Sequence, residues 1–379
     1  RFLMRFGLFY EWPNPEMRDW KSLFEEGIEQ IQYSEEMGFE FCLIAEHHFS
    51  NYGMSPAPLM QALYIAERTK ALKIATAVIV LPIWDPLRLA EEIAVLDNLT
   101  GGRFIAGVGR GYQPHELLRF GVPVESSRDR FNDTLQILYK AWTENESFTY
   151  EGKEVSVPLD TVVWPKPLTK PHPPMWVAGT SVETMELAAA WDMMPVTTGL
   201  LGGDGMRAHL TSLIHARMDL GKDIHGIELG MQAITHVAPT DAEAREQIEY
   251  ARWQNRAGRA LGRLEVTNGR VDVKPYEGEP DDDRFMERLY FGSPETVIAK
   301  FKRAAELGVT HVSCWSMFGG LEHEKIMRSI RLMGEEVIPA LKDVHPPTGL
   351  EDELAKTSKI TQEDLQSARS GPAPSDVPT

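Results

Sequence analysis

The chain alternates short apolar runs with longer segments of helical period, and this alternation limits its fold more than any other feature. The runs are bounded by turn residues, and the intervening segments place apolar side chains three and four residues apart. Such alternation predicts parallel strands, because each helix returns the chain to the start of the next strand. The apolar runs lie at residues 4–10, 41–46, 72–82, 103–109, 174–179, 192–198, 227–238 and 309–315. The helices predicted between and after them include residues 86–99, 241–261 and 321–341.

Eight pairs of strand and helix in one chain predict an α/β fold of the (β/α)8 or TIM-barrel type. Two segments do not fit the alternation and are predicted to be insertions after strands 4 and 7. Residues 143–173 contain a small hairpin and a proline-rich stretch. Residues 262–293 are polar, rich in turns and too long for an ordinary loop, which makes them a candidate lid.

Residues 1–345 are expected to form one catalytic domain. Residues 346–379 are rich in Pro, Ser, Lys and Glu, which predicts a C-terminal tail that is flexible or wraps a neighbouring subunit. No run of 18 apolar residues occurs, so neither a membrane helix nor a signal peptide is expected. The two cysteines, Cys42 and Cys314, lie in apolar stretches, which indicates a reducing, cytoplasmic location.

Net charge argues against nucleic acid as a partner. The 379 residues carry a formal charge of −17, and the sequence pI is near 5.2. The field of such a protein repels phosphate backbones and anionic membrane surfaces.

In a barrel of this type the active site lies at the C-terminal ends of the strands. The second run ends there in LIAEHHF, with Glu46, His47 and His48 in succession. A metal ion needs three or four converging donors, whereas neighbouring side chains on a strand point to opposite faces, so no metal site is expected. General acid–base catalysis and plain packing of both histidines remain open.

Two turns containing glycine indicate an anion site. In VGRGYQ, Arg110 lies between glycines, where its guanidinium can bind a phosphate with two hydrogen bonds. In AGTSVET, Thr180 and Ser181 begin a helix, and the free N–H groups of a helix start favour an anion. Arg128 in SSRDRF is a second candidate cation. Alternatively, Ser181 is only a helix cap and Arg128 only a solvated charge.

Together these motifs resemble the bacterial luciferase-like, flavin-dependent monooxygenase family. The resemblance runs through MRFGLFYEW, LIAEHHF, TAVIVLP, DPLRLAEEIAVLDNLTGGRF, GVGRGY, RFNDTLQILYKAW, VAGTS and GSPETVIAKFKRAAELGVTHV. Members of this family bind flavin mononucleotide (FMN) in a TIM barrel, usually as the reduced form delivered by a separate flavin reductase. Dioxygen then adds to the flavin, and the resulting C4a-peroxide attacks an organic substrate. The resemblance therefore implies a two-component FMN-dependent monooxygenase that forms a homodimer.

The resemblance also implies roles for individual residues. His47 corresponds to the catalytic histidine of the family, with Glu46 and His48 beside it in the motif. A non-proline cis peptide bond is expected between Ala77 and Val78, against the flavin ring. The cofactor-binding residues implied in this way are Ala77, Val78, Arg110, Tyr112, Arg128, Gly179, Thr180 and Ser181. Gly109 stands where luciferase has a reactive cysteine, so light emission is not implied.

Aromatic and methionine side chains follow several of the predicted strands and indicate a small hydrophobic substrate. An apolar pocket would also keep water from the reduced flavin and O2. The predicted substrate-binding residues are Trp12, Phe49, Tyr52, Trp84, Trp315 and Met317. Some of these are alternatively core aromatics. The alternative functions are an oxidoreductase that uses a deazaflavin (coenzyme F420) and a flavin-binding protein without catalysis.

Overall fold

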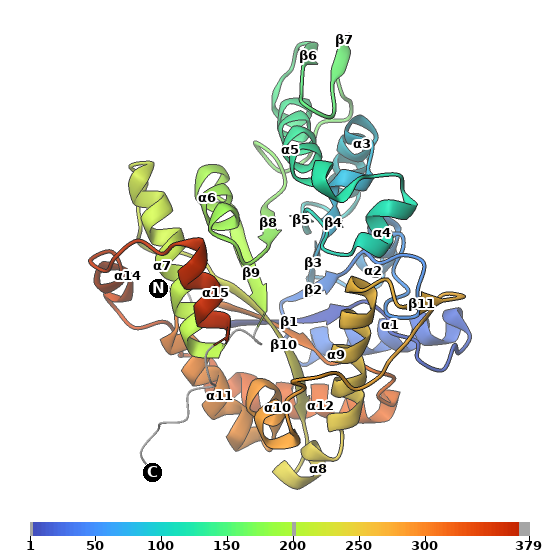
Figure 1. Ribbon diagram of the computed structural model, residues 1–379, viewed down its shortest axis with the longest axis vertical. Coiled ribbons are helices and arrows are strands. Elements are labelled where there is room, and N and C mark those ends of the chain that lie inside the picture. Colours follow the sequence, from blue (N-terminus) through green and yellow to red (C-terminus); the bar gives the residue numbers. More distant parts are fainter. Residues whose placement is uncertain (1–2, 199–201, 371–379) are drawn as a thin grey trace.

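In the computed structural model, which describes residues 3–198 and 202–370, eight parallel strands close into a barrel (Figure 1). Each strand pairs with the next barrel strand along the chain, and the pairing of the last strand with the first closes the ring. The predicted (β/α)8 fold is therefore confirmed. The barrel strands are β1 (Arg5–Tyr10), β2 (Phe41–Ile44), β3 (Lys73–Thr76), β5 (Phe104–Gly109), β8 (Met175–Ala178), β9 (Met194–Thr198), β10 (Gly230–Val237) and β14 (His311–Trp315).

Helices surround the barrel and bury an apolar layer against its outer surface. Their starts follow local sequence: Asp19 and Asp85 cap two of them by accepting hydrogen bonds from the backbone N–H groups three residues later. The main helices are α1 (Trp20–Glu36), α2 (Pro58–Ala66), α3 (Pro86–Leu99), α5 (Ser127–Thr143), α6 (Val182–Trp191), α7 (Gly202–Asp219), α9 (Ile248–Gly262), α11 (Pro294–Glu306) and α12 (His323–Leu332).

Three predicted elements are divided in the structure. The third predicted strand is interrupted after β3 by the expected cis peptide bond between Ala77 and Val78, and pairing resumes at β4 (Ile79–Val80). The predicted helix at residues 241–261 consists of α8 (Asp241–Arg245) and α9. The last predicted helix contains a π-helical turn, η4 (Met333–Val337), before α13 (Ile338–Leu341). Short connecting elements are η1 (Leu81–Ile83), α4 (Pro114–Arg119), η2 (Val124–Ser126) and β13 (Tyr290–Gly292).

Both insertions occur where the sequence predicts them. The hairpin of β6 (Phe148–Tyr150) and β7 (Val157–Thr161) projects beyond α5 at the top of Figure 1. The second insertion contains β11 (Val266–Thr267), β12 (Arg270–Val271) and α10 (Asp282–Arg288). Its hairpin rests on the loop after β2, because Asn51 N–H donates to the carbonyl of Gly269 at 2.8 Å and Asn51 Oδ1 accepts from Val271 N–H at 2.9 Å.

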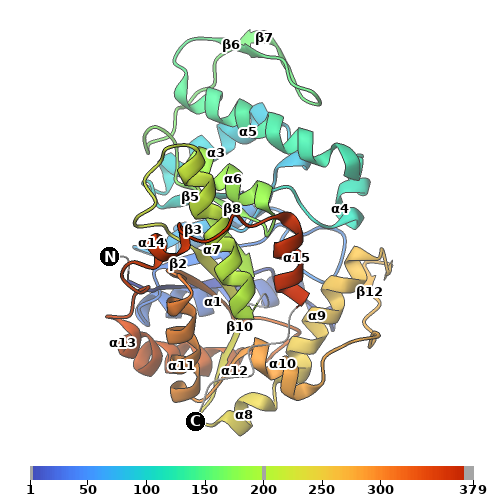
Figure 2. The ribbon, with the colours of Figure 1, turned by 60° about the vertical axis from the view of Figure 1, so that its left-hand side comes forward.

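The described part of the predicted tail, residues 346–370, lies against α7 of the same chain (Figure 2). It contains α14 (Leu350–Leu354) and α15 (Gln362–Ser370). Residues 371–379 lie outside the described residues.

Alternate side chains of the strands point inward and form an apolar layer in the middle of the barrel. Phe9, Leu43, Ala75, Ile105 and Met194 belong to this layer. It lies between two cavities, one at each end of the strands.

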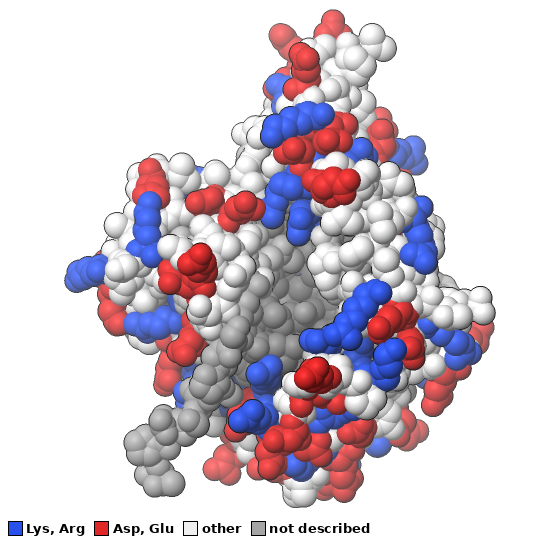
Figure 3. Space-filling model, in the orientation of Figure 1, with Lys and Arg blue, Asp and Glu red and all other residues white. Residues whose placement is uncertain are grey.

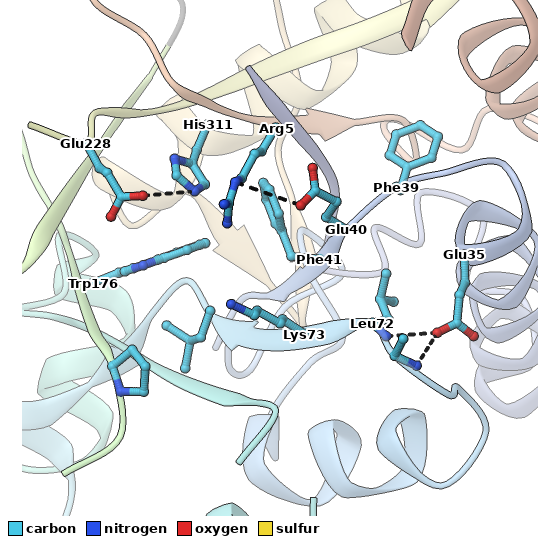
Figure 4. A pocket seen from close by; sticks show the side chains of 13 residues that line it. Arg5, Glu35, Phe39, Glu40, Phe41, Leu72, Lys73, Trp176, Glu228 and His311 are labelled. Carbon is cyan, nitrogen blue, oxygen red and sulfur yellow. Dashed lines mark hydrogen bonds and ion pairs between the residues drawn. The ribbon is translucent and has the colours of Figure 1, made fainter. Parts of the chain in front are cut away.

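The cavity at the N-terminal ends of the strands has a volume of about 370 Å³ (Figure 4). Its ionisable groups face one another: Arg5 Nε lies 3.8 Å from Glu40 Oε2, and His311 Nε2 lies 3.7 Å from Glu228 Oε1. Catalysis in barrels of this type occurs at the opposite end, where the strands finish.

Acidic and basic side chains are interspersed over the face shown in Figure 3. None of the helices within residues 3–198 and 202–370 combines the length and apolar character that crossing a bilayer requires.

Candidate active site

A cavity of about 680 Å³ opens at the C-terminal ends of the barrel strands. All eight predicted cofactor-binding residues line it, although they come from the ends of three different strands and from the start of α5. Of the three predicted catalytic residues, only His47 lines it. The structure thus brings His47 and Arg110, which are far apart in the sequence, to one cavity.

His47 lies between two carboxylates. Its Nδ1–H donates to Glu116 Oε1 at 2.9 Å, and its Nε2 lies 3.4 Å from Glu11 Oε2. The Tyr52 ring packs edge-on against the imidazole, with the two ring centroids 4.9 Å apart. Glu11 Oε1 also accepts from the side-chain amide of Gln254 at 2.5 Å. The imidazole is therefore fixed from both sides, and all these side chains are buried.

The two carboxylates control the protonation of His47. Burial alone would lower the pKa of His47, but the charge of Glu116 and the hydrogen bonds to Glu11 and Glu116 outweigh it and hold the pKa well above its usual range. Burial raises the pKa of Glu11, against the opposing effect of His47. Burial also favours neutral Glu116, but the charge and hydrogen bond of His47 dominate and lower its pKa. The favoured state is a protonated His47 beside an ionised Glu116, with Glu11 placed to share the proton.

Glu46 and His48 point away from the cavity and into a separate hydrogen-bond network. Glu46 Oε2 accepts from Val80 N–H at 2.6 Å, just beyond the cis peptide bond. Glu46 Oε1 accepts from His48 Nε2 at 3.0 Å and from the Trp84 indole at 3.0 Å. The alternation of side chains along an extended chain thus places His47 inside and its two neighbours outside. Within the described residues, no group of three or more His, Cys, Asp or Glu side chains could hold a metal ion.

Arg110 and Arg128 lie at a second corner of the cavity. Burial, followed by the nearby charge of Arg128, lowers the pKa of Arg110. Arg128 Nη2 also forms an ion pair with Glu183 at 2.8 Å. Ser181 is the N-cap of α6, because its Oγ accepts from Thr184 N–H at 3.2 Å. Ser181 therefore caps the helix and also lines the cavity.

Glycine permits a close approach next to the cis peptide bond. A Cβ on Gly107 would lie 1.6 Å from the carbonyl oxygen of Thr76, so no side chain fits there. The Thr76 hydroxyl also bonds this glycine, because it donates to the Gly107 carbonyl at 2.8 Å. A Cβ on Gly109 would lie 2.7 Å from Val78 Cγ2, at the cavity wall.

Of the six predicted substrate-binding residues, only Tyr52 and Trp315 line the cavity. Trp12 is fully buried outside the barrel, where it packs against Tyr10 and Phe24. The other three also lie elsewhere. Trp84 turns outward to Glu46, Phe49 is 49% exposed and contacts Phe120, and Met317 is buried in the outer apolar layer.

Sequence reasoning did not select Glu116, Gln254 or Gln362, which the structure places at or beside this cavity. They lie on the helices α4, α9 and α15 and do not directly follow a strand, and no local pattern marks them. Glu11 carries a usable signal, because it directly follows β1 and a strand end is where catalytic groups are expected.

Known proteins resemble this chain in sequence and in fold. The oxygenase component of the flavin-dependent trigonelline monooxygenase of Acinetobacter baylyi is 26% identical, with 90% of this chain and 96% of that protein covered. The oxygenating constituent of 3,6-diketocamphane monooxygenase from Pseudomonas putida, a type II Baeyer–Villiger monooxygenase solved in complex with FMN, superposes with a TM-score of 0.75. It is 21% identical, with 91% of this chain and 100% of that chain covered.

A structure of different chemistry has a similar fold. An F420-dependent secondary alcohol dehydrogenase, in complex with an F420–acetone adduct, superposes with a TM-score of 0.70 at 19% identity, with 90% of this chain and 100% of that chain covered. At this identity the likeness shows the fold alone. The family profile described as luciferase-like monooxygenase matches residues 4–311, which is most of the chain. The chain therefore belongs to the luciferase-like monooxygenase family.

Proposed function

We propose that this chain is the oxygenase component of a two-component monooxygenase, which takes reduced FMN from a separate flavin reductase and transfers one oxygen atom from O2 to a small hydrophobic substrate. The observation that carries the proposal is the single cavity shared by His47, the Ala77–Val78 peptide bond and the two arginines. The relatives that bind flavin support it.

The residues of the cavity fit FMN. The volume of about 680 Å³ lies within the range of small-molecule and cofactor sites. Gly109 and Gly179 let the segments of its wall pack closely, since a Cβ on either would lie within 2.7 Å of a neighbouring side chain. The charge of Arg128 contributes to lowering the pKa of Arg110, and a phosphate between the two side chains would offset that repulsion.

Bound reduced FMN would supply the electrons that activate O2. The protein supplies proton control: protonated His47, which lines the cavity and directs Nε2 toward Glu11, can donate a proton to a developing oxyanion. Glu116 is a positioning residue, because it orients the imidazole through Nδ1 and stabilises its charge. Glu11 can return a proton to Nε2 afterwards.

The remaining wall is suited to an apolar substrate. Phe9, Leu43, Val196 and Trp315 face the cavity, while Tyr52 closes it beneath the hairpin of the second insertion. Excluding water at this wall would keep activated oxygen available for the substrate. This supports a hydrophobic carbonyl compound or ring as the substrate class, and a lid role for residues 262–293.

The proposal is tested by loading the protein with reduced FMN under anaerobic conditions, admitting isotopically labelled O2 and screening hydrophobic aldehydes, ketones and aromatic compounds by mass spectrometry. We expect one labelled oxygen atom in a product. In His47→Gln, the amount of product formed per O2 consumed should fall greatly. His172→Gln, a change of the same type outside the cavity, serves as the control. The proposal would be refuted if neither oxidised nor reduced FMN bound to the protein.

A second candidate is an oxidoreductase that uses reduced or oxidised F420, because this fold is also that of an F420-dependent alcohol dehydrogenase. The same cavity would then bind a deazaflavin, and His47 would exchange a proton with an alcohol or ketone. Reduction of oxidised F420 by small secondary alcohols, without O2, would support this reading. A non-catalytic flavin-binding protein would bind FMN and show no product in either assay.

We also propose that the chain forms a homodimer through α2 and α3. Met60 on α2 and Leu99 on α3 are 76% and 58% exposed, and Trp164 beside them is 60% exposed. Apolar side chains gathered in this way favour a covered face. Light scattering should show a dimer that Leu99→Glu weakens, whereas Leu159→Glu, at an exposed position on β7, should leave it intact.

A further inference from the structure

The C-terminal arm, defined here as residues 346–370, is attached to the outside of the barrel beside α7 (Figures 1 and 2). Leu350, Leu354 and Leu365 are buried, which anchors both helices of the arm. Lys359 adds an ion pair with Asp219 on α7 at 2.5 Å. The arm is therefore held by three apolar side chains and by surface charges, so its attachment is moderate in strength.

The arm places one side chain in the candidate active site. Gln362, the first residue of α15, lines the same cavity as Arg110 and Arg128. Its Oε1 accepts a hydrogen bond from the backbone N–H of Val182 at 3.1 Å. Val182 is the first residue of α6, so this N–H is one of those that a helix start offers to an anion.

An amide oxygen is a neutral substitute for a phosphate oxygen at such a donor, because it carries a partial negative charge and accepts the same hydrogen bond. A second group of the chain acts in the same way nearby: the Glu183 carboxylate holds Arg128. Two donors suited to a phosphate are thus already paired with groups of the protein.

We propose that Gln362 belongs to the cofactor-phosphate site and occupies the place of a phosphate oxygen at Val182, so that the arm and the phosphate compete for the same N–H. This inference rests on the proposed function, because FMN supplies the phosphate. Binding of FMN displaces Gln362 from α6 and loosens the start of α15. The affinity for the phosphate is accordingly lower than the arginines alone would give.

The competition predicts an effect that depends on the phosphate. Gln362→Ala frees the Val182 N–H, and the net value of one hydrogen bond corresponds to about 2- to 10-fold tighter FMN binding. Riboflavin, which has the same ring without the phosphate, should bind Gln362→Ala and the unaltered protein equally. Gln362→Glu places a negative charge at the phosphate position and should weaken FMN binding.

The experiment measures both flavins by quenching of flavin fluorescence, with Gln32→Ala as the matched control, since Gln32 also bonds a backbone group through its side-chain amide but lies on α1. Hydrogen exchange of the arm is followed with FMN, with riboflavin and with inorganic phosphate. We expect faster exchange in the arm with FMN and with phosphate only.

The outcomes separate the two proposals. Weaker FMN binding by Gln362→Ala would make Gln362 a direct cofactor ligand and overturn the competition, as would equal effects on riboflavin. Exchange that neither FMN nor phosphate accelerates would also overturn it. If no flavin binds and phosphate still loosens the arm, the proposed function fails while the competition stands.

Discussion

Replacing Glu46 by glutamine distinguishes a structural role for this residue from a catalytic one. Glu46 is 3% exposed, and its two oxygens accept from Val80 N–H, His48 Nε2 and the Trp84 indole. Glutamine keeps one acceptor oxygen and turns an NH2 group toward donors on the other side. At least one hydrogen bond to a charged group is lost and a buried donor is left unpaired, which costs about 2–4 kcal/mol.

This loss converts into a measurable shift of the melting temperature. Unfolding entropy of roughly 2.1 cal/mol/K per residue, taken over the 379 residues, gives about 0.8 kcal/mol/K for the chain. We therefore expect Glu46→Gln to melt about 3–5 °C lower than the unaltered protein. Calorimetry should be done without flavin and at one fixed flavin concentration, because a bound ligand itself raises the melting temperature.

Glu92→Gln is the matched control. Glu92 bonds Arg88 at 2.6 Å on the surface of α3, where the same exchange should change the melting temperature by less than about 1 °C. A Glu46→Gln protein that melts with the unaltered one but turns over far more slowly would refute the structural role. It would instead place Glu46 in the chemistry, as the sequence motif suggests.

Three further predictions concern charge and space. Glu116→Gln removes the charge that opposes burial at His47, so the pKa of His47 falls and the decline of kcat/KM with rising pH begins at lower pH; an unchanged profile contradicts this. Gly109→Ala places a Cβ against Val78 and should weaken FMN binding about tenfold or more in a titration, with the fold retained. Burial lowers the pKa of His311 to about 3, so the free energy of unfolding falls as the pH drops from about 6.5 toward 3. In urea denaturation, His311→Gln should lose up to about 4 kcal/mol less of this free energy over that range than the unaltered protein does.

The eight barrel strands were predictable because each is a short apolar run closed by turn residues. The helix at residues 86–99 is also predicted to its ends, since Asp85 caps it and Pro86 occupies its first position. By contrast, no local pattern separates α8 from α9, and the start of α8 is held by distant groups: Asp241 accepts from Ser293 N–H at 2.7 Å and from the Thr296 hydroxyl at 3.0 Å. Contacts of this kind leave no trace in local periodicity.

At the site, the alternation of side chains along β1 would have excluded Trp12 from the predicted substrate-binding residues. Phe9 points into the barrel, so Glu11 points to the cavity, and Tyr10 and Trp12 point outward. A position at a strand end therefore does not by itself predict that a residue lines the cavity, because its side chain must also point inward. Gln254 is different, because it reaches Glu11 from 243 residues away, and only the closed barrel brings them together.

The cluster of Glu11, His47 and Glu116 is costly to the fold, which strengthens the argument that it serves chemistry. Buried ion pairs recover little more than the free energy of taking both charges out of water, and apolar side chains of similar volume are often as stable. The neighbouring barrel interior shows that alternative, since Phe9 and Leu43 belong to a buried cluster of apolar side chains. Stability alone thus gives no reason for an imidazole between two carboxylates at the open end of the barrel. A cavity that must keep a proton ready while excluding water does give one.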